Sequence, residues 1–281
     1  MKKGLVLKPA EPDHFLMGSG RATERFGDTT DLNPTGDWTP YKAQDEHQSN
    51  ASFDTDCCWI FSTLKPYIML ANLQGFDDFP KDLAERFIAV MADAQSTGGN
   101  PWDAGEVFRK MGCIIEQALP FTDSITTWEE WKHPVPMDSS FVSLAKALLN
   151  KYEIGHEWVF AWGNSYTPAQ KTQMIADAAK RGPVSYSVDG NYRFNRKKQL
   201  TKPVGGQDTH WVTHLTMNPD DSKTFHDQYD PFEVKVEKDY DHNAAILHFL
   251  KKKEVVNPTF WDNVLEILAN HFKSIWATLH Q

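Results

Sequence analysis

The chain has 281 residues, 40% of them hydrophobic, and its 29 basic and 38 acidic residues give a formal charge of -9. An acidic chain without a basic block argues against nucleic acid as a partner. The first apolar run stops at Lys8, which is too short for a signal peptide, and no run approaches the ~20 residues of a membrane span. We therefore expect a folded, cytoplasmic protein that does not bind membranes.

The first half of the chain is predicted to be mostly helical. Residues 1–50 are rich in Gly, Pro, Asp and Thr, which indicates an extended arm with turns. Short polar residues then precede an apolar segment that begins at Trp59, and this pattern indicates a helix that stops at Gly75. Pro66 should kink or interrupt that helix. Further helices are expected at 81–94 and 102–111.

The second half is predicted to be richer in strands. After helices at 139–151 and 168–181, alternating or apolar runs indicate strands at 184–188, 211–217, 223–229, 232–237 and 244–250. Helices followed by strands favour the α+β class over alternating α/β. The expected segments are the arm over 1–50, a helical lobe over 51–135, a β-rich lobe over 136–256 and a C-terminal helix over 257–281.

The C-terminal helix would carry a single apolar stripe. Such a stripe is typical of a helix that packs on the core. A contact with another copy of the chain or with a partner is the alternative, and the sequence does not separate the two. The stripe consists of Trp261, Val264, Leu265, Leu268, Phe272, Ile275, Trp276 and Leu279.

The chain contains three cysteines: Cys57, Cys58 and Cys113. This odd and low number is no disulfide framework, and a bond between the adjacent Cys57 and Cys58 would be strained. We therefore expect free thiols in a reducing compartment. The sequence has neither Cys-x-x-Cys nor His-Glu-x-x-His, so no metal and no cofactor is expected.

Cys58 is the candidate nucleophile. A cysteine at the start of a helix lies among unpaired N–H groups and at the positive end of the dipole, which lowers its pKa and favours the thiolate. His210 lies at a loop–strand junction and could act as its base, and Asp227 could hold the second ring nitrogen of that base. Taken singly, these residues also fit an inert buried cysteine, a surface histidine and a turn aspartate.

Short segments in a fixed order resemble the papain-like cysteine peptidases across residues 36–230. Cys58–Ser62 resembles the Cys-Trp-Ala-Phe-Ser run around the papain nucleophile, with Ile60 as the single replacement, and residues 98–104 resemble the family's Gly-Gly-Tyr-Pro-Trp-Ser-Ala stretch. Weaker matches occur at Gly36–Pro40, Gln48, Leu119–Phe121, Arg181–Ser185, Thr209–Val212 and Asp227–Tyr229.

The resemblance implies a two-lobe fold, with a helical lobe and an antiparallel, barrel-like β lobe to which the N-terminal arm crosses. It also implies hydrolysis of peptide bonds, with a peptide or protein as the substrate. Cys58, His210 and Asp227 would form the catalytic triad, and Gln48 would complete the oxyanion hole. Substrate would bind at Gly98, Gly99, Asn100 and Ser187, with Trp59 and Tyr229 supporting the cleft.

Departures from the family pattern indicate a divergent bacterial or phage-type member without disulfides or a pro-region. The interval from Gln48 to Cys58 is several residues longer than in papain, and Asp227 stands where the family has asparagine. Three other interpretations remain open. One is a degenerate papain-like protein with a binding role, and another is an amidase or transglutaminase-like enzyme on the same triad. The third is a metal site at His210, His214, Asp208 and His226.

Overall fold

The computed structural model describes residues 4–17, 31–133, 139–190 and 206–254. The chain divides into two units, Met1–Lys251 and Lys252–Gln281, and the description that follows concerns the first. The predicted C-terminal helix lies outside the described residues. Within the described ranges, no helix is both long and apolar enough to cross a membrane.

Helix α2 (Cys58–Gln74) is the central element of the helical half. Every residue from Cys58 to Ala71 is buried, because the segment is apolar on all faces and packs against α3, α4, β2 and β3. Gly75 ends the helix as predicted. It adopts φ 66°, in the left-handed region, and its N–H bonds Ala71 O and Asn72 O.

The other helices follow the predicted ranges closely. Asn100 caps α4, since its side chain accepts a hydrogen bond from the Trp102 N–H. The short helix α5 was not predicted. It begins with a capping box of Thr127 and Glu130. The remaining elements are η1 (Thr39–Tyr41), α3 (Glu85–Met91), α4 (Pro101–Met111), η2 (Glu116–Ala118), α5 (Trp128–Lys132), α6 (Ser139–Lys151) and α7 (Pro168–Arg181).

A six-stranded sheet forms the second half, in the order β1-β6-β2-β3-β4-β5. Strand β2 pairs antiparallel with both β6 and β3, and β4 pairs antiparallel with both β3 and β5. The strands are β1 (Tyr152–Phe160), β2 (Val184–Val188), β3 (His210–Met217), β4 (Lys223–His226), β5 (Glu233–Val236) and β6 (Ala245–Lys252).

Strand β1 is the one strand in the described part of the chain that the sequence did not predict. Its run contains Glu153, Gly155, His156 and Glu157, so it lacks the continuous run of apolar and β-branched residues that marks a buried strand. The strand is nevertheless buried along almost its whole length, because α4, α6 and α7 all pack on it. Arg181 pairs with the buried Glu157 at 3.1 Å and so compensates its charge.

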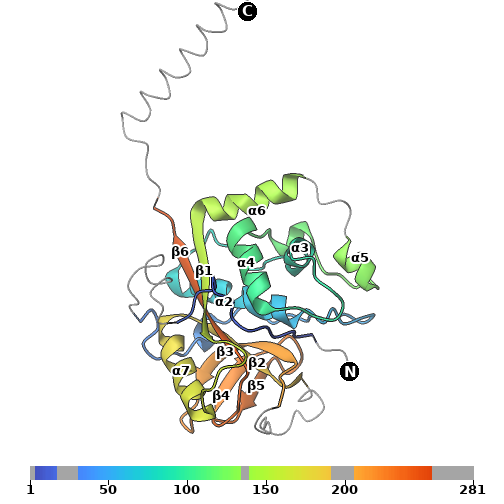
Figure 1. The fold of residues 1–281 in the computed structure, drawn as a ribbon. Coiled ribbons are helices and arrows are strands. Elements are labelled where there is room, and N and C mark those ends of the chain that lie inside the picture. Colours follow the sequence, from blue (N-terminus) through green and yellow to red (C-terminus); the bar gives the residue numbers. More distant parts are fainter. Residues whose placement is uncertain (1–3, 18–30, 134–138, 191–205, 255–281) are drawn as a thin grey trace, which may run out of the picture. The chain divides into compact units, whose positions relative to one another are not determined.

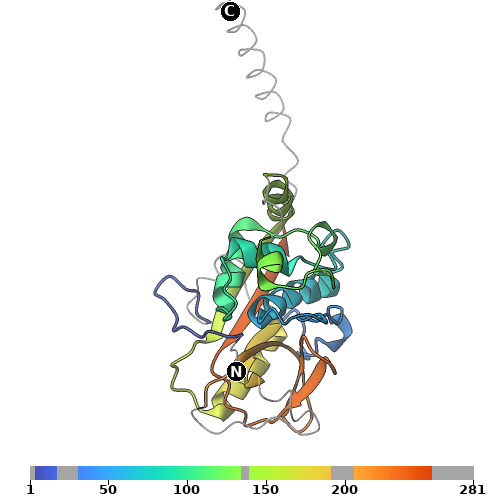
Figure 2. The same cartoon turned by 90° about the vertical axis from the view of Figure 1, so that its right-hand side faces the viewer.

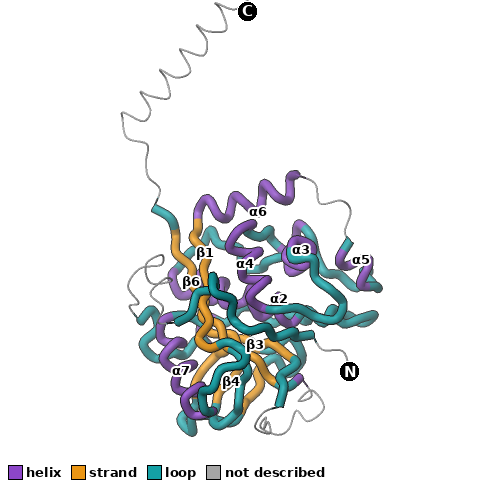
Figure 3. The backbone as a smooth tube through the Cα atoms, in the orientation of Figure 1, coloured by secondary structure: helices purple, strands orange, loops and turns teal. Residues whose placement is uncertain are grey.

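Helices and strands gather in two groups that meet at α2. Helices α3 to α6 lie on one side of α2, and strands β2 to β5 with α7 lie on the other (Figures 1 and 2). Figure 3 shows the strands together, with α7 beside them. Each group has its own hydrophobic cluster, one around Phe61 and Phe87 and the other around Ile175 and Tyr186. Helices followed by an antiparallel sheet give the predicted α+β class, while the predicted segment boundaries stay predictions.

Candidate active site

Two reciprocal hydrogen bonds fasten α2 to β3. The Ser62 hydroxyl donates to Trp211 O at 2.8 Å, and the Thr213 hydroxyl donates to Ser62 O at 3.0 Å. Pro66 explains the second bond. It lacks the N–H that would bond the carbonyl four residues earlier, so the Ser62 carbonyl is left for Thr213. The proline therefore does not end the helix, and it frees a docking point for the strand that begins with His210.

Cys58 is the first residue of α2 and lies next to the start of β3. A hydrogen bond from the Trp211 backbone reaches its sulfur, and Trp211 follows His210 in the strand. The thiol is fully buried. Burial raises its pKa well above the ordinary value, and the charges of Asp54, Asp56 and Asp227 raise it further. The lowered pKa expected from the helix terminus is therefore wrong for this covered site.

The N-terminal strand, which we define as residues 4–7, lies over the Cys58 thiol. The Val6 N–H donates to Gly99 O at 2.9 Å, and the Gly99 N–H donates to Gly4 O at 3.3 Å. These bonds form a parallel bridge between Leu5 and Gly99. A Cβ added to Gly4 would lie 3.2 Å from Cys58 Sγ, so only glycine fits this close approach without displacement. Nothing in the sequence pattern indicated that this segment would cover the site.

The side chains of that segment alternate between the protein and solvent. Leu5 and Leu7 are buried in the helical cluster, whereas Val6 is 40% exposed. Alternation of this kind is typical of an extended strand with one face on the core. Burial of two leucines, added to the two backbone bonds, therefore holds the strand in place.

His210 and Asp227 form the predicted pair. His210 Nε2 lies 2.7 Å from Asp227 Oδ1, and both side chains are almost completely buried. Burial raises the pKa of Asp227 to about 7, although a hydrogen bond from the Gln228 backbone and the charge of Lys65 oppose this. The centroids of the Tyr229 ring and the His210 imidazole are 5.8 Å apart, and the shielding role expected of Tyr229 stays a prediction.

Gln48 is held by a carboxylate that the resemblance did not indicate. Its Nε2 donates to Asp54 Oδ1 at 2.8 Å, and the Tyr229 hydroxyl donates to Asp54 Oδ2 at 2.5 Å. The longer interval before Cys58 forms a small hairpin, closed by a bridge between Ser49 and Asp54. This hairpin brings Asp54 beside Gln48. Gln48 Oε1 is buried and has no hydrogen-bond partner among the described residues.

The residues expected to bind substrate fall into two groups. Gly99 lies against Trp59, and a Cβ there would come within 2.5 Å of the indole ring, so Trp59 forms the floor beneath the Gly99 backbone. Gly98 adopts φ 96° in the tight turn before it. The Asn100 side chain caps α4 by accepting a hydrogen bond from the Trp102 N–H, which is typical of a structural residue.

Ser187 lies away from this group, inside the sheet. It is fully buried, and its hydroxyl donates to Asp208 Oδ2 at 2.6 Å while it accepts from the Asn243 and Ala244 N–H groups. The Tyr240 hydroxyl also donates to Asp208. This closed network is typical of a structural support and offers no free hydroxyl to a ligand.

The four residues of the alternative metal site do not converge. Asp208 belongs to the Ser187 network, and His226 Nε2 pairs with Asp45 at 3.0 Å. His214 is fully buried, and neither ring nitrogen has a partner among the residues that the structure describes. Within those same ranges, the one group of three side chains close enough to share an ion is Glu11, Asp13 and His14.

Comparison of the sequence with protein-family models and with curated proteins finds no match. Comparison with solved structures finds cysteine proteases. A digestive procathepsin L2 proteinase from the larval midgut of Tenebrio molitor has a TM-score of 0.60 at 14% identity, covering 88% of this chain and 78% of that chain. Xylellain, a cysteine protease from Xylella fastidiosa, has a TM-score of 0.53 at 15% identity, covering 90% of this chain and 97% of that chain.

The bromelain protease from Ananas comosus, solved with a bound inhibitor, gives a TM-score of 0.52 at 15% identity, covering 76% of this chain and 98% of that chain. These neighbours share the papain-like fold, and the predicted fold class is confirmed. At such low identity the likeness establishes the fold alone.

Proposed function

We propose that the chain is a papain-like cysteine peptidase that hydrolyses peptide bonds with Cys58 as its nucleophile. The observation that carries the proposal is the pairing of His210 Nε2 with Asp227 Oδ1 at 2.7 Å, directly beside a strand backbone that reaches the Cys58 sulfur. This arrangement supports a nucleophile, a base and an orienting carboxylate acting together, as covalent catalysis requires.

In this mechanism His210 takes the thiol proton through Nδ1, because Nε2 is engaged by Asp227. The thiolate adds to the peptide carbonyl. The oxyanion forms beside the Cys58 N–H, which has no carbonyl partner within α2 because Cys58 is its first residue, and beside Gln48 Nε2. One such donor is worth about 3–4 kcal/mol of barrier. His210 then protonates the leaving amine, and water releases the acyl group from Cys58.

Turnover requires the N-terminal strand to move away from Cys58 and Gly99. Gly99 is the residue whose backbone the resemblance assigns to the substrate strand, and here Gly4 and Val6 take both of its hydrogen bonds. Departure of the strand would expose Cys58 and remove much of the burial that raises its pKa. The protonated imidazole would then stabilise the thiolate at short range.

One observation favours the alternative of an inactive binding protein with the same fold. Cys58 is fully buried, and three carboxylates act to raise its pKa. If the strand never opened, the thiol would stay protonated and inert. Turnover of a peptide by the purified protein separates the two proposals.

The test is hydrolysis of an unfolded protein substrate such as casein, followed by mass spectrometry of the products. We expect cleavage by the wild type, none by Cys58→Ala, and cleavage by Cys57→Ala, the matched control for loss of an adjacent buried thiol. Equal products from wild type and Cys58→Ala would contradict the proposal.

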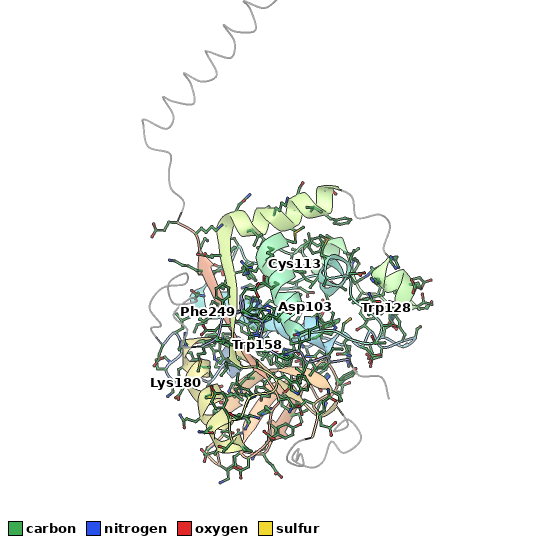
Figure 4. The ribbon with its side chains drawn as sticks, viewed as in Figure 1. Asp103, Cys113, Trp128, Trp158, Lys180 and Phe249 are labelled. Carbon is green, nitrogen blue, oxygen red and sulfur yellow. The ribbon has the colours of Figure 1, made fainter. Side chains whose placement is uncertain are left out.

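We also propose a cytoplasmic location and a bacterial or phage-type origin. The support for a reducing location is that Cys57, Cys58 and Cys113 are all free thiols and all buried. Cys113 lies among the helices (Figure 4).

A further inference from the structure

A buried lysine lies directly behind the catalytic pair. Lys65 is on α2, seven residues after Cys58 and therefore on the same face of the helix. It is 1% exposed. Its Nζ donates to the backbone carbonyl of Asp227 at 3.0 Å. The same helix therefore carries the candidate nucleophile and a cation that contacts the residue orienting the candidate base.

A second contact ties the Asp227 loop to α2. The Gln228 side chain donates to the Ser62 hydroxyl, which itself donates to Trp211 O in β3. Asp227 and Gln228 follow the last residue of β4, and the Gln48 N–H also donates to Gln228 O at 3.4 Å. Lys65 and Ser62 together fix the backbone from which the Asp227 carboxylate reaches His210.

Burial of an ammonium group requires compensation. The carboxylates that face Lys65 come from three segments: Glu46 and Asp45 from the N-terminal arm, Glu85 from α3, and Asp227 from the loop after β4. Burial lowers the pKa of Lys65, and these four groups oppose that shift.

The charge of Lys65 also acts on the groups around it. It opposes the burial that raises the pKa of Asp227. Together with Lys42 it also acts to lower the pKa of His226, the last residue of β4, although burial is the larger cause there.

We propose that Lys65 is a positioning residue, a buried cation that holds the Asp227 backbone in place and keeps its carboxylate ionised for His210. This inference rests on the proposed peptidase function, since it concerns the same catalytic pair. Charges then alternate through the site, from the Lys65 ammonium through the Asp227 carboxylate and the His210 imidazolium to the Cys58 thiolate. Each member favours the charged form of the next.

The site would need such a cation. A neutral Asp227 carboxyl could still bond His210, but it would no longer stabilise the imidazolium, and the thiolate would lose its counter-ion. Since burial already brings the pKa of Asp227 to about 7, loss of the neighbouring positive charge would leave the group largely protonated at neutral pH.

The test is the rate at which iodoacetamide alkylates Cys58 across the pH range, measured by mass spectrometry, since this readout needs no substrate. In the wild type, a thiolate–imidazolium pair gives appreciable reactivity below the pH at which a free thiol ionises. The acid limb is the part of the profile in which the alkylation rate rises with pH as Cys58 ionises. In Lys65→Met we expect this limb to move to higher pH by about one pKa unit, so that the rate at neutral pH falls about tenfold. Opening of the N-terminal strand affects the alkylation rates of the wild type and of Lys65→Met by the same factor, so it does not shift the pH dependence.

Three variants sharpen the test. Lys65→Arg keeps the charge and should keep the wild-type acid limb. Lys223→Met removes a buried lysine that also donates to backbone carbonyls, those of Glu237 and Lys238, but that is not part of the site, and it should change nothing. In the Asp227→Asn background, where no carboxylate is left to ionise, Lys65→Met should have no further effect on the profile.

The outcomes distinguish the two proposals. A wild-type Cys58 that reacts only as an ordinary thiol overturns the peptidase mechanism and this inference with it. If the wild type shows the thiolate–imidazolium pair but the acid limb of Lys65→Met is not shifted, this inference alone is overturned. An equal shift in Lys223→Met would overturn it as well. If Lys65→Met does not fold, Lys65→Gln, which retains a donor without the charge, takes its place and must show the same shift.

Discussion

Loosening the N-terminal strand should make Cys58 more reactive. Val6→Pro removes the N–H that donates to Gly99 O at 2.9 Å and leaves the rest of the strand unchanged. Val6 is 40% exposed, so little buried surface is lost, and proline accepts an extended residue before it. A backbone hydrogen bond contributes about 0.5–1.5 kcal/mol net. The population with the strand open, and with it the rate of Cys58 alkylation, should rise by roughly two- to twelvefold.

The assay is alkylation by iodoacetamide at neutral pH, with the extent at each cysteine read by mass spectrometry. Val6→Ala retains the N–H and should react at nearly the wild-type rate. Leu5→Ala removes a side chain that is 2% exposed and should raise the rate by about 30-fold or more, since such a truncation costs about 2–5 kcal/mol. An unchanged Cys58 rate in both Val6→Pro and Leu5→Ala would refute the claim that this strand limits access.

Three further predictions concern carboxylates. Asp54→Asn removes a negative charge that raises the pKa of Cys58, so alkylation of Cys58 should be faster at neutral pH; a slower reaction would show that Asp54 matters through Gln48 instead. Asp227→Ala should lower kcat on the order of 100-fold while KM changes little, and unchanged kinetics would mean that another group orients His210. Burial raises the pKa of Glu116 to about 8, so the folded state keeps a proton that the unfolded chain releases. Stability should therefore fall as pH rises from about 4.5 to 8, and Glu116→Gln should flatten this dependence of Tm.

Local signals in the sequence accounted for most of the fold. Gly75 and Asn100 mark a helix end and a helix start by chemistry that is entirely local. Pro66 is visible in the sequence, but its structural consequence is not local. The Ser62 carbonyl, which Pro66 leaves without a helical partner, accepts a hydrogen bond from Thr213 on β3. Strand β1 was not predicted, because its polar and glycine residues look unlike a buried strand until α4, α6 and α7 pack on it in the folded chain.

The order of the family motifs along the chain identified the catalytic candidates. The environment of the site, in contrast, is visible only in the tertiary structure. The pairing of His210 with Asp227 agrees with the order of the motifs. The direction of the pKa shift at Cys58 does not follow from helix position, since it depends on burial beneath the N-terminal strand and on the charges of Asp54, Asp56 and the distant Asp227. Lys65 was part of an apolar helix pattern, and only the folded chain shows what its ammonium contacts.

The most direct test of the whole account is labelling with an epoxide that inactivates cysteine peptidases, followed by peptide mapping. The account predicts a single modified residue, Cys58, with labelling lost in both Cys58→Ala and His210→Ala and increased in Val6→Pro. Modification of Cys57 or Cys113 with Cys58 left untouched would contradict it.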